Sequence, residues 1–452
     1  MKIIIAGGGK VGAALTRQLS AEGYDLTLID TNTAVLERTM NAYDVMAVQG
    51  NCATMSALGQ AGVEEADLLI AVTNADEVNL LCCMTAHTIN PRLHTIARIR
   101  NPEYTDQIFR MRSSFGLSLT VNPEKQAASE IRRLLQYPGF LRRETFAKSR
   151  VEIVELKIDA KSKLCNVTLG NLGSVVKCRV LVCAVLRDGA AIAPSGNFSL
   201  REGDRIFVTA PTESLTVLLR NLGVITRPLK RVILCGGGKV SYYLAQLLEK
   251  DGVTVQLIER SRERCVELAA MLPQVSVLCG DASSQPLLES EDVSTADALV
   301  TLTGLDELNM IVSLYASSRG VPRIVTKLGR MESTGIVEDL SLGSVVYPKE
   351  LCSNTIVRYV RAMQNQAGAA LSVHSIADGQ MEAVEFLVDD TTPHCGEPLK
   401  NLKLKPNVLV ACITHGSKTE IPNGDSCFRK GDSIILVTPG RGTLLQLNDI
   451  FA

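Results

Sequence analysis

The sequence has no run of about 18 apolar residues, the length that a helix needs to span a bilayer. Its first apolar stretch, Ile3–Ala6, is too short for the core of a secretory signal peptide. A basic excess is also missing: 47 Lys and Arg face 48 Asp and Glu, so nucleic acid is not an expected partner. We expect a soluble, cytoplasmic protein that takes part in membrane processes only through a partner.

The sequence also lacks the usual patterns of disulfides and metal sites. Its 13 cysteines include no C-x-x-C pair, and we interpret them as small buried apolar residues in a reducing compartment. Cys83 and His87 have the i, i+4 spacing of one helix face, but no third ligand completes a zinc site. We therefore predict no metal.

The N-terminal stretch carries a dinucleotide-binding fingerprint. Lys2–Ala6 is predicted to be a buried strand, and Leu26–Ile29 a second strand that ends at Asp30. Between them stands a glycine turn that opens a helix, and its residues are Gly7, Gly8, Gly9, Lys10, Val11 and Gly12. Strand, glycine turn, helix, strand and acid in this order are typical of a βαβ unit that binds NAD.

Each part of this fingerprint has a physical role. Gly7 permits the tight turn, Gly9 lets a pyrophosphate approach the backbone, and Gly12 lets the helix pack closely on the strand. The helix N-terminus offers unpaired N–H groups to phosphates. Asp30 can accept hydrogen bonds from the ribose hydroxyls and repels a 2′-phosphate, which favours NAD over NADP. The alternative is a glycine-rich turn without a ligand.

The fingerprint occurs again 229 residues later. The second turn consists of Gly236, Gly237, Gly238, Lys239 and Val240. Glu259 takes the place of Asp30, and Ser241 the place of Gly12, so binding at the second copy is less certain. Other landmarks recur at nearly the same separation; they are Gly50-Asn51 with Gly280-Asp281, Thr73 with Thr303, Arg98 with Lys327, Pro123 with Pro348, and Arg201–Asp204 with Arg429–Asp432. A separation this steady indicates tandem duplication.

The fold class follows from the alternation of elements. Short apolar strands alternate with helices of about 10–15 residues, which predicts Rossmann-like, doubly wound parallel sheets with helices on both faces. Each copy then changes to alternating strands, such as the half-buried pattern of Val151–Ile158, with Gly-Asp turns. We predict Rossmann lobes at 1–140 and 230–362, small α+β lobes at 141–225 and 370–452, and a linker at 225–230.

Several polar residues are predicted at the carboxyl ends of the strands, where ligands of open α/β sheets bind. Thr73 and Asn74 follow the fourth strand, with helix capping as the alternative role. Arg98 and Lys327 end the fifth strands, with an exposed surface charge as the alternative. Asn51 and Asp281 occupy equivalent positions and could give the two clefts different nucleotide preferences.

Groups for catalysis are scarce. The sequence contains no Tyr-x-x-x-Lys pair and no Ser–His–Asp set. Its histidines, none of which recurs between the copies, are His87, His94, His374, His394 and His415. A dehydrogenase needs a proton donor or acceptor beside the nicotinamide. We therefore predict a nucleotide-binding protein that is not an enzyme.

The duplicated pattern, from the GGGKVG turn through Asp30, Gly50-Asn51 and TNADEVN to the Arg-x-Gly-Asp modules, resembles the TrkA family. These are peripheral cytoplasmic subunits of Trk potassium uptake systems, built from tandem RCK (KTN) domains. The resemblance implies a regulator on the inner face of the cell membrane that binds NAD(H), with ATP or ADP as a further ligand. It also implies gating of an integral-membrane Trk transporter subunit, and a homo-oligomer formed through the Rossmann lobes by helices near Pro123 and Pro348.

The resemblance further implies which residues contact the nucleotide. In the first half these are Gly7 to Val11, Asp30, Thr73, Asn74 and Arg98, and in the second half Gly236 to Val240, Glu259 and Lys327. Gly12, Asn51 and Asp281 complete the predicted cofactor-binding set. Two other functions stay open, namely an NAD-dependent oxidoreductase with duplicated Rossmann domains and a scaffold with vestigial Rossmann lobes.

Overall fold

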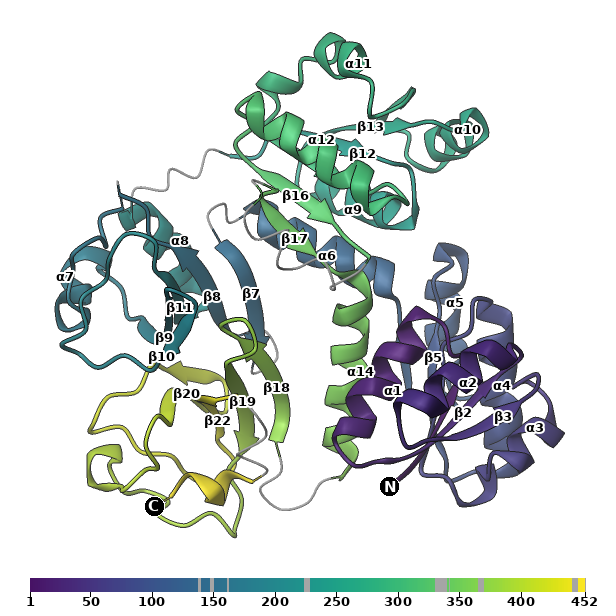
Figure 1. Ribbon diagram of the computed structural model, residues 1–452, viewed down its shortest axis with the longest axis horizontal. Coiled ribbons are helices and arrows are strands. Elements are labelled where there is room, and N and C mark those ends of the chain that lie inside the picture. Colours follow the sequence, from purple (N-terminus) through teal and green to yellow (C-terminus); the bar gives the residue numbers. More distant parts are fainter. Residues whose placement is uncertain are drawn as a thin grey trace.

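The computed structural model describes residues 1–136, 140–146, 150–160, 162–222, 228–329, 340, 342–364, 370–440 and 446–451. Part of the predicted linker, 225–227, lies outside these residues. Figure 1 shows two α/β lobes at the top and right, and two smaller lobes beside each other at the left. In the described parts of the chain, no helix combines the length and the apolar character that crossing a membrane requires.

The first α/β lobe is a six-stranded parallel sheet in the order β3-β2-β1-β4-β5-β6. Its strands are β1 (Lys2–Ala6), β2 (Asp25–Asp30), β3 (Met46–Gln49), β4 (Leu68–Ala71), β5 (His94–Arg98) and β6 (Leu119–Val121). Its helices are α1 (Lys10–Ala21), α2 (Thr33–Ala42), α3 (Met55–Gln60), α4 (Asp76–Ile89), α5 (Pro102–Met111) and α6 (Pro123–Gln136). Ile4 packs into the core on one face of the sheet, and Ile3 and Ile5 into the core on the other. Burial on both faces explains why β1 is apolar throughout.

The second α/β lobe repeats this topology, with strand order β14-β13-β12-β15-β16-β17. Its strands are β12 (Arg231–Cys235), β13 (Thr254–Glu259), β14 (Ser276–Cys279), β15 (Ala298–Thr301), β16 (Ile324–Lys327) and β17 (Ser344–Val346). Its helices are α9 (Lys239–Lys250), α10 (Arg262–Met271), α11 (Gln285–Ser290), α12 (Asp306–Ser318) and α14 (Pro348–Gln364). Both predicted Rossmann-like parallel sheets are therefore confirmed. In each sheet the strand order reverses beside the central strand, which creates a crevice at the carboxyl ends.

The two small lobes are antiparallel sheets in the orders β10-β9-β11-β8-β7 and β18-β19-β22-β20-β21. The first contains β7 (Phe140–Phe146), β8 (Val151–Lys157), β9 (Leu181–Arg187), β10 (Ala190–Ile192), β11 (Arg205–Pro211), α7 (Leu172–Val176) and α8 (Thr212–Leu222). The second contains β18 (Ala370–Ile376), β19 (Met381–Leu387), β20 (Leu409–His415), β21 (Lys418–Glu420) and β22 (Ser433–Pro439).

The prediction that Val151–Ile158 forms a half-buried strand is wrong about its burial. Glu152 and Glu155, on its predicted polar positions, are each only 2% exposed. For Glu155, which shares a face with Ile153, the reason is that the two small lobes share one core, in which Ile153 packs with Ile435 and others. A second sheet thus covers the face that would otherwise meet solvent. Glu152 lies on the opposite face, with Val154 in the core of the first small lobe.

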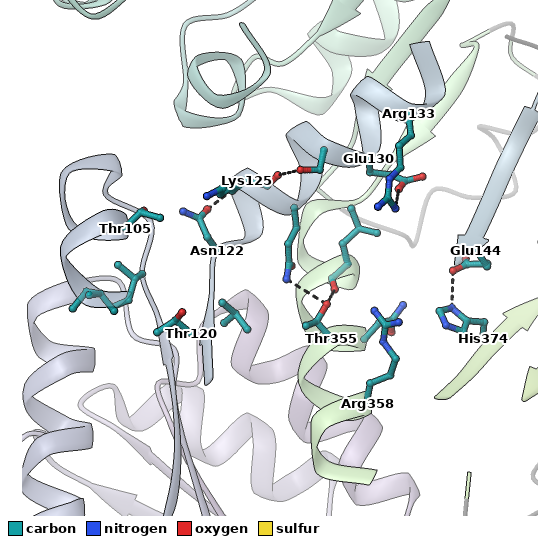
Figure 2. Close-up of a pocket in the computed structure, with 17 residues that line it drawn as sticks. Thr105, Thr120, Asn122, Lys125, Glu130, Arg133, Glu144, Thr355, Arg358 and His374 are labelled. Carbon is teal, nitrogen blue, oxygen red and sulfur yellow. Dashed lines mark hydrogen bonds and ion pairs between the residues drawn. The ribbon is translucent and has the colours of Figure 1, made fainter. Parts of the chain in front are cut away.

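Helices α6 and α14 are exchanged between the halves. Ile131 of α6 is buried in the core of the second α/β lobe, whereas Ile356 of α14 is buried in the core of the first. Figure 1 shows α14 beside α1. Where the two helices meet, Gln126 Nε2 donates to Thr355 Oγ1 at 3.3 Å (Figure 2). The apolar faces of the helices near Pro123 and Pro348, for which the family resemblance implied contacts between chains, are thus buried within one chain.

Candidate functional site

The first glycine turn combines close packing with an open helix end. Gly7 has φ +103°, and a Cβ there would lie 2.9 Å from Thr73 N. A Cβ on Gly12 would lie 1.9 Å from Gly7 O, so the helix can approach the strand only without one. Beside Gly9, by contrast, no atom of the described residues lies within 4 Å of the place a Cβ would take. The N-terminus of α1 therefore faces space in which a phosphate could reach its N–H groups.

Asp30 lies at the end of β2, directly beside this turn. Its Oδ2 accepts a hydrogen bond from Gly8 N at 2.6 Å, and its Oδ1 accepts one from Asn32 N at 2.8 Å. The carboxylate is half-buried. It is thus held at the position from which a dinucleotide-binding acid contacts a ribose.

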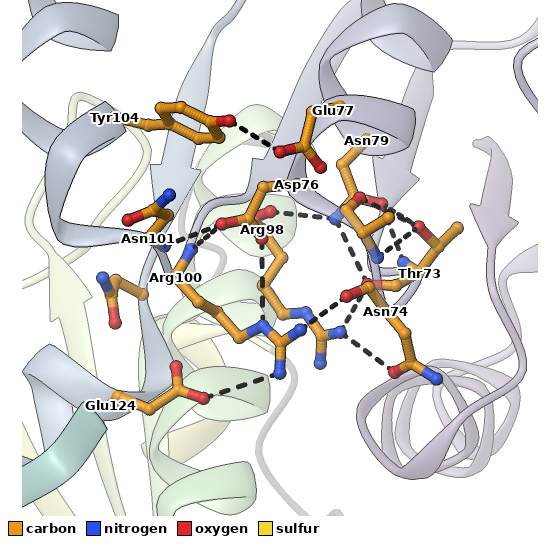
Figure 3. Close-up of polar contacts among 12 residues, drawn as sticks. Thr73, Asn74, Asp76, Glu77, Asn79, Arg98, Arg100, Asn101, Tyr104 and Glu124 are labelled. Carbon is orange, nitrogen blue, oxygen red and sulfur yellow. Dashed lines mark hydrogen bonds and ion pairs between the residues drawn. The ribbon is translucent and has the colours of Figure 1, made fainter. Parts of the chain in front are cut away.

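Thr73 and Asn74 lie at the end of β4 in a polar network around Asn79 (Figure 3). The fully buried Asn79 accepts hydrogen bonds from Thr73 N at 2.8 Å and Thr73 Oγ1 at 2.7 Å, and its Nδ2 donates to Arg98 O at 2.9 Å. The residue that precedes α4 is Ala75, and no side chain caps the helix. The alternative role of Thr73 and Asn74 as helix caps is therefore not observed.

Arg98 is buried at the end of β5 and is not a surface charge. It is 7% exposed, and its guanidinium donates to Thr73 O and, at 3.4 Å, to Asn74 Oδ1. Burial, and then the neighbouring Arg100, lower the pKa of Arg98. Its Nε is buried and has no hydrogen-bond partner among the described residues. The guanidinium thus places a buried positive charge at the carboxyl ends of the strands, which favours an anionic ligand in the crevice.

The second lobe reproduces this geometry. Gly236 has φ +107°, and Glu259 Oε2 accepts a hydrogen bond from Gly237 N at 2.7 Å. Ser241 is fully buried, and its hydroxyl donates to Gly236 O. The serine that replaces the third glycine is thus accommodated by a hydrogen bond to the turn. Lys327 is half-buried, its Nζ donates to Leu302 O at 3.2 Å, and burial lowers its pKa.

Asn51 and Asp281 are exposed and engaged in their own turns. Asn51 Oδ1 accepts from Ala53 N at 3.0 Å, and Asp281 Oδ1 accepts from Ser283 N at 2.8 Å. These bonds to Ser283 lower the pKa of Asp281. The two side chains follow the edge strands β3 and β14, and the structure shows no bond between either of them and a glycine turn.

One difference between the clefts was not predicted from the sequence. Glu124 is the second residue of α6, and Lys349 is the second residue of α14. Glu124 Oε1 lies 3.8 Å from Arg100 Nη1, whereas Lys349 Nζ donates to Gly329 O at 2.5 Å. Because α14 packs on the first lobe, it brings Lys349 near Lys10 of the first glycine turn, although the bond to Gly329 O ties its ammonium to the second lobe just after β16. The sequence shows an acid after Pro123 and a base after Pro348. It does not show that the two helices are exchanged, and the positions of these side chains depend on that exchange.

Lys349 meets a second cation at the first glycine turn. Burial, and then the neighbouring ammonium of Lys10, lower the pKa of Lys349 to about 8. Two adjacent ammonium groups repel each other, and an anion between them would remove that repulsion. The chemistry at the N-terminus of α1 therefore suits the phosphates of a nucleotide. Across the described residues, no three His, Cys, Asp or Glu side chains are grouped so that they could hold a metal ion.

Comparison with known proteins places these features in one family. The TrkA-N domain model matches residues 3–123 and 232–348, and the TrkA-C domain model matches residues 153–223. The Trk system potassium uptake protein TrkA homolog of Archaeoglobus fulgidus is 31% identical over 437 residues, which cover 96% of this chain and 97% of that protein. The Trk system potassium uptake protein TrkA of Haemophilus influenzae is 30% identical over 460 residues, which cover 100% and 98%.

Solved structures agree on the fold. The GsuK RCK domain is 17% identical, with a TM-score of 0.62, and the match covers 96% of this chain and 92% of that one. The GsuK channel bound to NAD also has a TM-score of 0.62 at 17% identity, covering 97% and 76%. The TrkA-N domain model matches more than half of the chain, and the two relatives align over nearly the full length of both proteins. The chain belongs to the TrkA family, with two TrkA-N domains in tandem.

Proposed function

We propose that the protein is a peripheral, cytoplasmic regulatory subunit of a Trk-type potassium uptake system. It binds NAD(H) at its two glycine turns, with ATP or ADP as a further ligand, and gates an integral-membrane potassium-translocating subunit. The observation that carries the proposal is the pair of glycine turns, each with a carboxylate bonded to it and an open helix N-terminus. The names of the relatives support potassium uptake, and the fold is that of a channel solved with NAD and with ADP.

The proposed ligand contacts follow from the geometry of the first cleft. The N–H groups at the start of α1 face the phosphates, and Asp30 accepts hydrogen bonds from the ribose. Thr73 and Asn74 line the crevice, and Arg98 supplies a buried positive charge. In the second cleft Glu259 and Lys327 take the roles of Asp30 and Arg98. No step of this proposal requires a chemical reaction of the cofactor.

Regulation requires only modest energies. A ligand that fits one arrangement of the lobes better than another typically contributes about 1–3 kcal/mol of coupling per site. A shift from 1:99 to 99:1 requires about 5.5 kcal/mol, which several sites in a homo-oligomer can supply together. Exposed apolar residues support such an assembly through the Rossmann lobes. Leu81 of α4 is 46% exposed and Ile311, at the equivalent place on α12, is 62% exposed.

A calorimetric titration tests nucleotide binding. We expect two NADH sites per wild-type chain and a loss of about tenfold to a hundredfold in affinity at one of them in Asp30→Ala, because hydrogen bonds to a carboxylate contribute about 1.5–3 kcal/mol. Glu259→Ala is the matched variant and should weaken the other site. Wild-type affinity in both variants would contradict nucleotide binding at the glycine turns.

Membrane gating and enzymatic activity need separate tests. We expect a membrane potassium transporter to co-purify with the chain, in an amount that changes when NADH is added. If no transporter is captured under either condition, the regulatory role is wrong. Sustained loss of NADH absorbance with a carbonyl substrate would instead support the oxidoreductase alternative.

Proton uptake is expected when NADH binds to the first cleft. With a pKa of about 8, roughly half of the Lys349 side chains are neutral at pH 8. A phosphate beside the ammonium raises that pKa, so binding at pH 8 takes up as much as about half a proton. Calorimetry in buffers with different ionisation enthalpies measures the uptake. Lys349→Gln should abolish it and Glu124→Gln should retain it; the same uptake in Lys349→Gln would contradict the assignment.

A further inference from the structure

A cavity of about 480 Å³ lies where the first α/β lobe meets α6, α14 and the first strands of both small lobes (Figure 2). No residue of either glycine turn lines it. Its charged lining residues are Lys125, Glu130, Arg133, Glu144 and Arg358, and the imidazole of His374 also lines it. Its volume is within the range of about 300–1,000 Å³ that is usual for pockets that bind small molecules.

The cavity lies where the two halves of the chain present equivalent residues to each other. Arg133 and Arg358 are 225 residues apart, as are Pro123 and Pro348 at the starts of their helices. Both arginines line the cavity, and Figure 2 shows Arg133 above Arg358, with the two side chains extending toward each other. Because α6 and α14 are equivalent helices of the two halves, their equivalent arginines line the same cavity.

The carboxylates of the cavity do not neutralise both arginines. Glu144 Oε2 lies 2.6 Å from His374 Nδ1, and the imidazole of His374 is 6% exposed. Glu130 Oε2 lies 3.7 Å from Arg133 Nη1, which is an ion pair too long for a hydrogen bond. Arg358 is half-buried and has no carboxylate partner among the described residues. With Lys125 also in the lining, positive charge is in excess.

The remaining lining contains polar and apolar groups. Hydroxyl groups come from Ser129, Thr355, Thr105 and Thr120. Apolar side chains come from Ile99, Ile108 and Val121 of the first lobe, and each is at most 6% exposed. This arrangement suits a molecule with one anionic group and a compact body of lower polarity.

We propose that this cavity binds a small organic phosphate. The phosphate lies between Arg133 and Arg358, because the planar guanidinium fork donates two parallel hydrogen bonds to phosphate oxygens. The body of the ligand contacts Ile99, Ile108 and Val121. Such a ligand touches both exchanged helices and lies beside β7 and β18, so it would report metabolic state at a place distinct from the glycine turns. A ligand with a carboxylate could also accept two hydrogen bonds from a guanidinium group, so the test compares a phosphate with a carboxylate.

Arginine labelling of the full-length wild-type chain locates the site. The phosphate ligand is ribose 5-phosphate, and succinate is the comparison ligand that carries carboxylates. Phenylglyoxal modifies accessible arginines, and peptide mass mapping then identifies which arginines have reacted. We expect ribose 5-phosphate to protect Arg133 and Arg358, and to leave the exposed Arg92 reactive. Unchanged labelling of both cavity arginines would overturn the proposal, as would protection by succinate alone.

Binding to variants provides the second measurement. By calorimetry we expect Arg358→Gln and Arg133→Gln each to weaken ribose 5-phosphate at least about tenfold, because a hydrogen bond between charged groups is lost. Arg92→Gln is the matched control and should bind as wild type does. NADH affinity should be unchanged in all three, which separates this site from the glycine turns. Wild-type affinity for ribose 5-phosphate in Arg358→Gln would overturn the proposal, whatever the NADH result.

Discussion

Replacing Gly9 by valine is expected to reduce NADH affinity at the first cleft by more than about a hundredfold while the fold keeps its stability. The backbone of Gly9 has φ −64° and ψ −171°, an extended conformation that any residue adopts. Within the part of the chain that the structure describes, a Cβ there meets no atom within 4 Å, so the fold accommodates it. In the proposed function a pyrophosphate approaches the start of α1 through the same space, and the valine side chain would exclude it.

The matched variant Gly12→Val should behave in the opposite way. A Cβ at Gly12 would lie 1.9 Å from Gly7 O, so the helix and the strand must separate. We expect thermal unfolding without ligand to show a loss of about 1–3 kcal/mol or more for Gly12→Val, and none for Gly9→Val. Gly238→Val should reproduce the Gly9 result in the second cleft. NADH binding to Gly9→Val at wild-type affinity would contradict the proposed phosphate position.

The features that the sequence predicted well are those set by local chemistry. The strand β1, the glycine turn and Asp30 lie within the first 30 residues, and a hydrogen bond from Gly8 N to Asp30 joins the turn to the end of β2. Duplication strengthened the prediction, because the same signals recur around Glu259. A local pattern also marked α5, which was not predicted. Asn101 accepts from Glu103 N and Pro102 is the first helical residue, a standard helix start.

The features that were missed depend on contacts between distant parts of the chain. A strand such as β8 reveals where its apolar residues stand, but not whether a second sheet covers one of its faces, as it does at Glu155. In the same way, the sequence of an amphipathic helix reveals which face is apolar, but not which lobe that face packs against. The roles of Glu124 and Lys349 could not be predicted, because they depend on which lobe each helix covers.

Exchange of the two helices predicts that stability is linked across the halves. Ile356 of α14 is fully buried with Leu15 and Leu19 of α1, so Ile356→Ala should destabilise the first α/β lobe by about 2–5 kcal/mol. Hydrogen exchange should therefore quicken in α1 and β1, although the substitution lies in the second half of the sequence. Ile131→Ala in α6 is the matched variant: Ile131 is buried with Leu244 and should quicken exchange in α9 instead. If each substitution loosened only the lobe of its own half, the exchange of helices would be wrong. If the expected pattern is found, neither lobe can loosen without affecting a helix of the other half, which is the mechanical link that a regulator with two nucleotide sites requires.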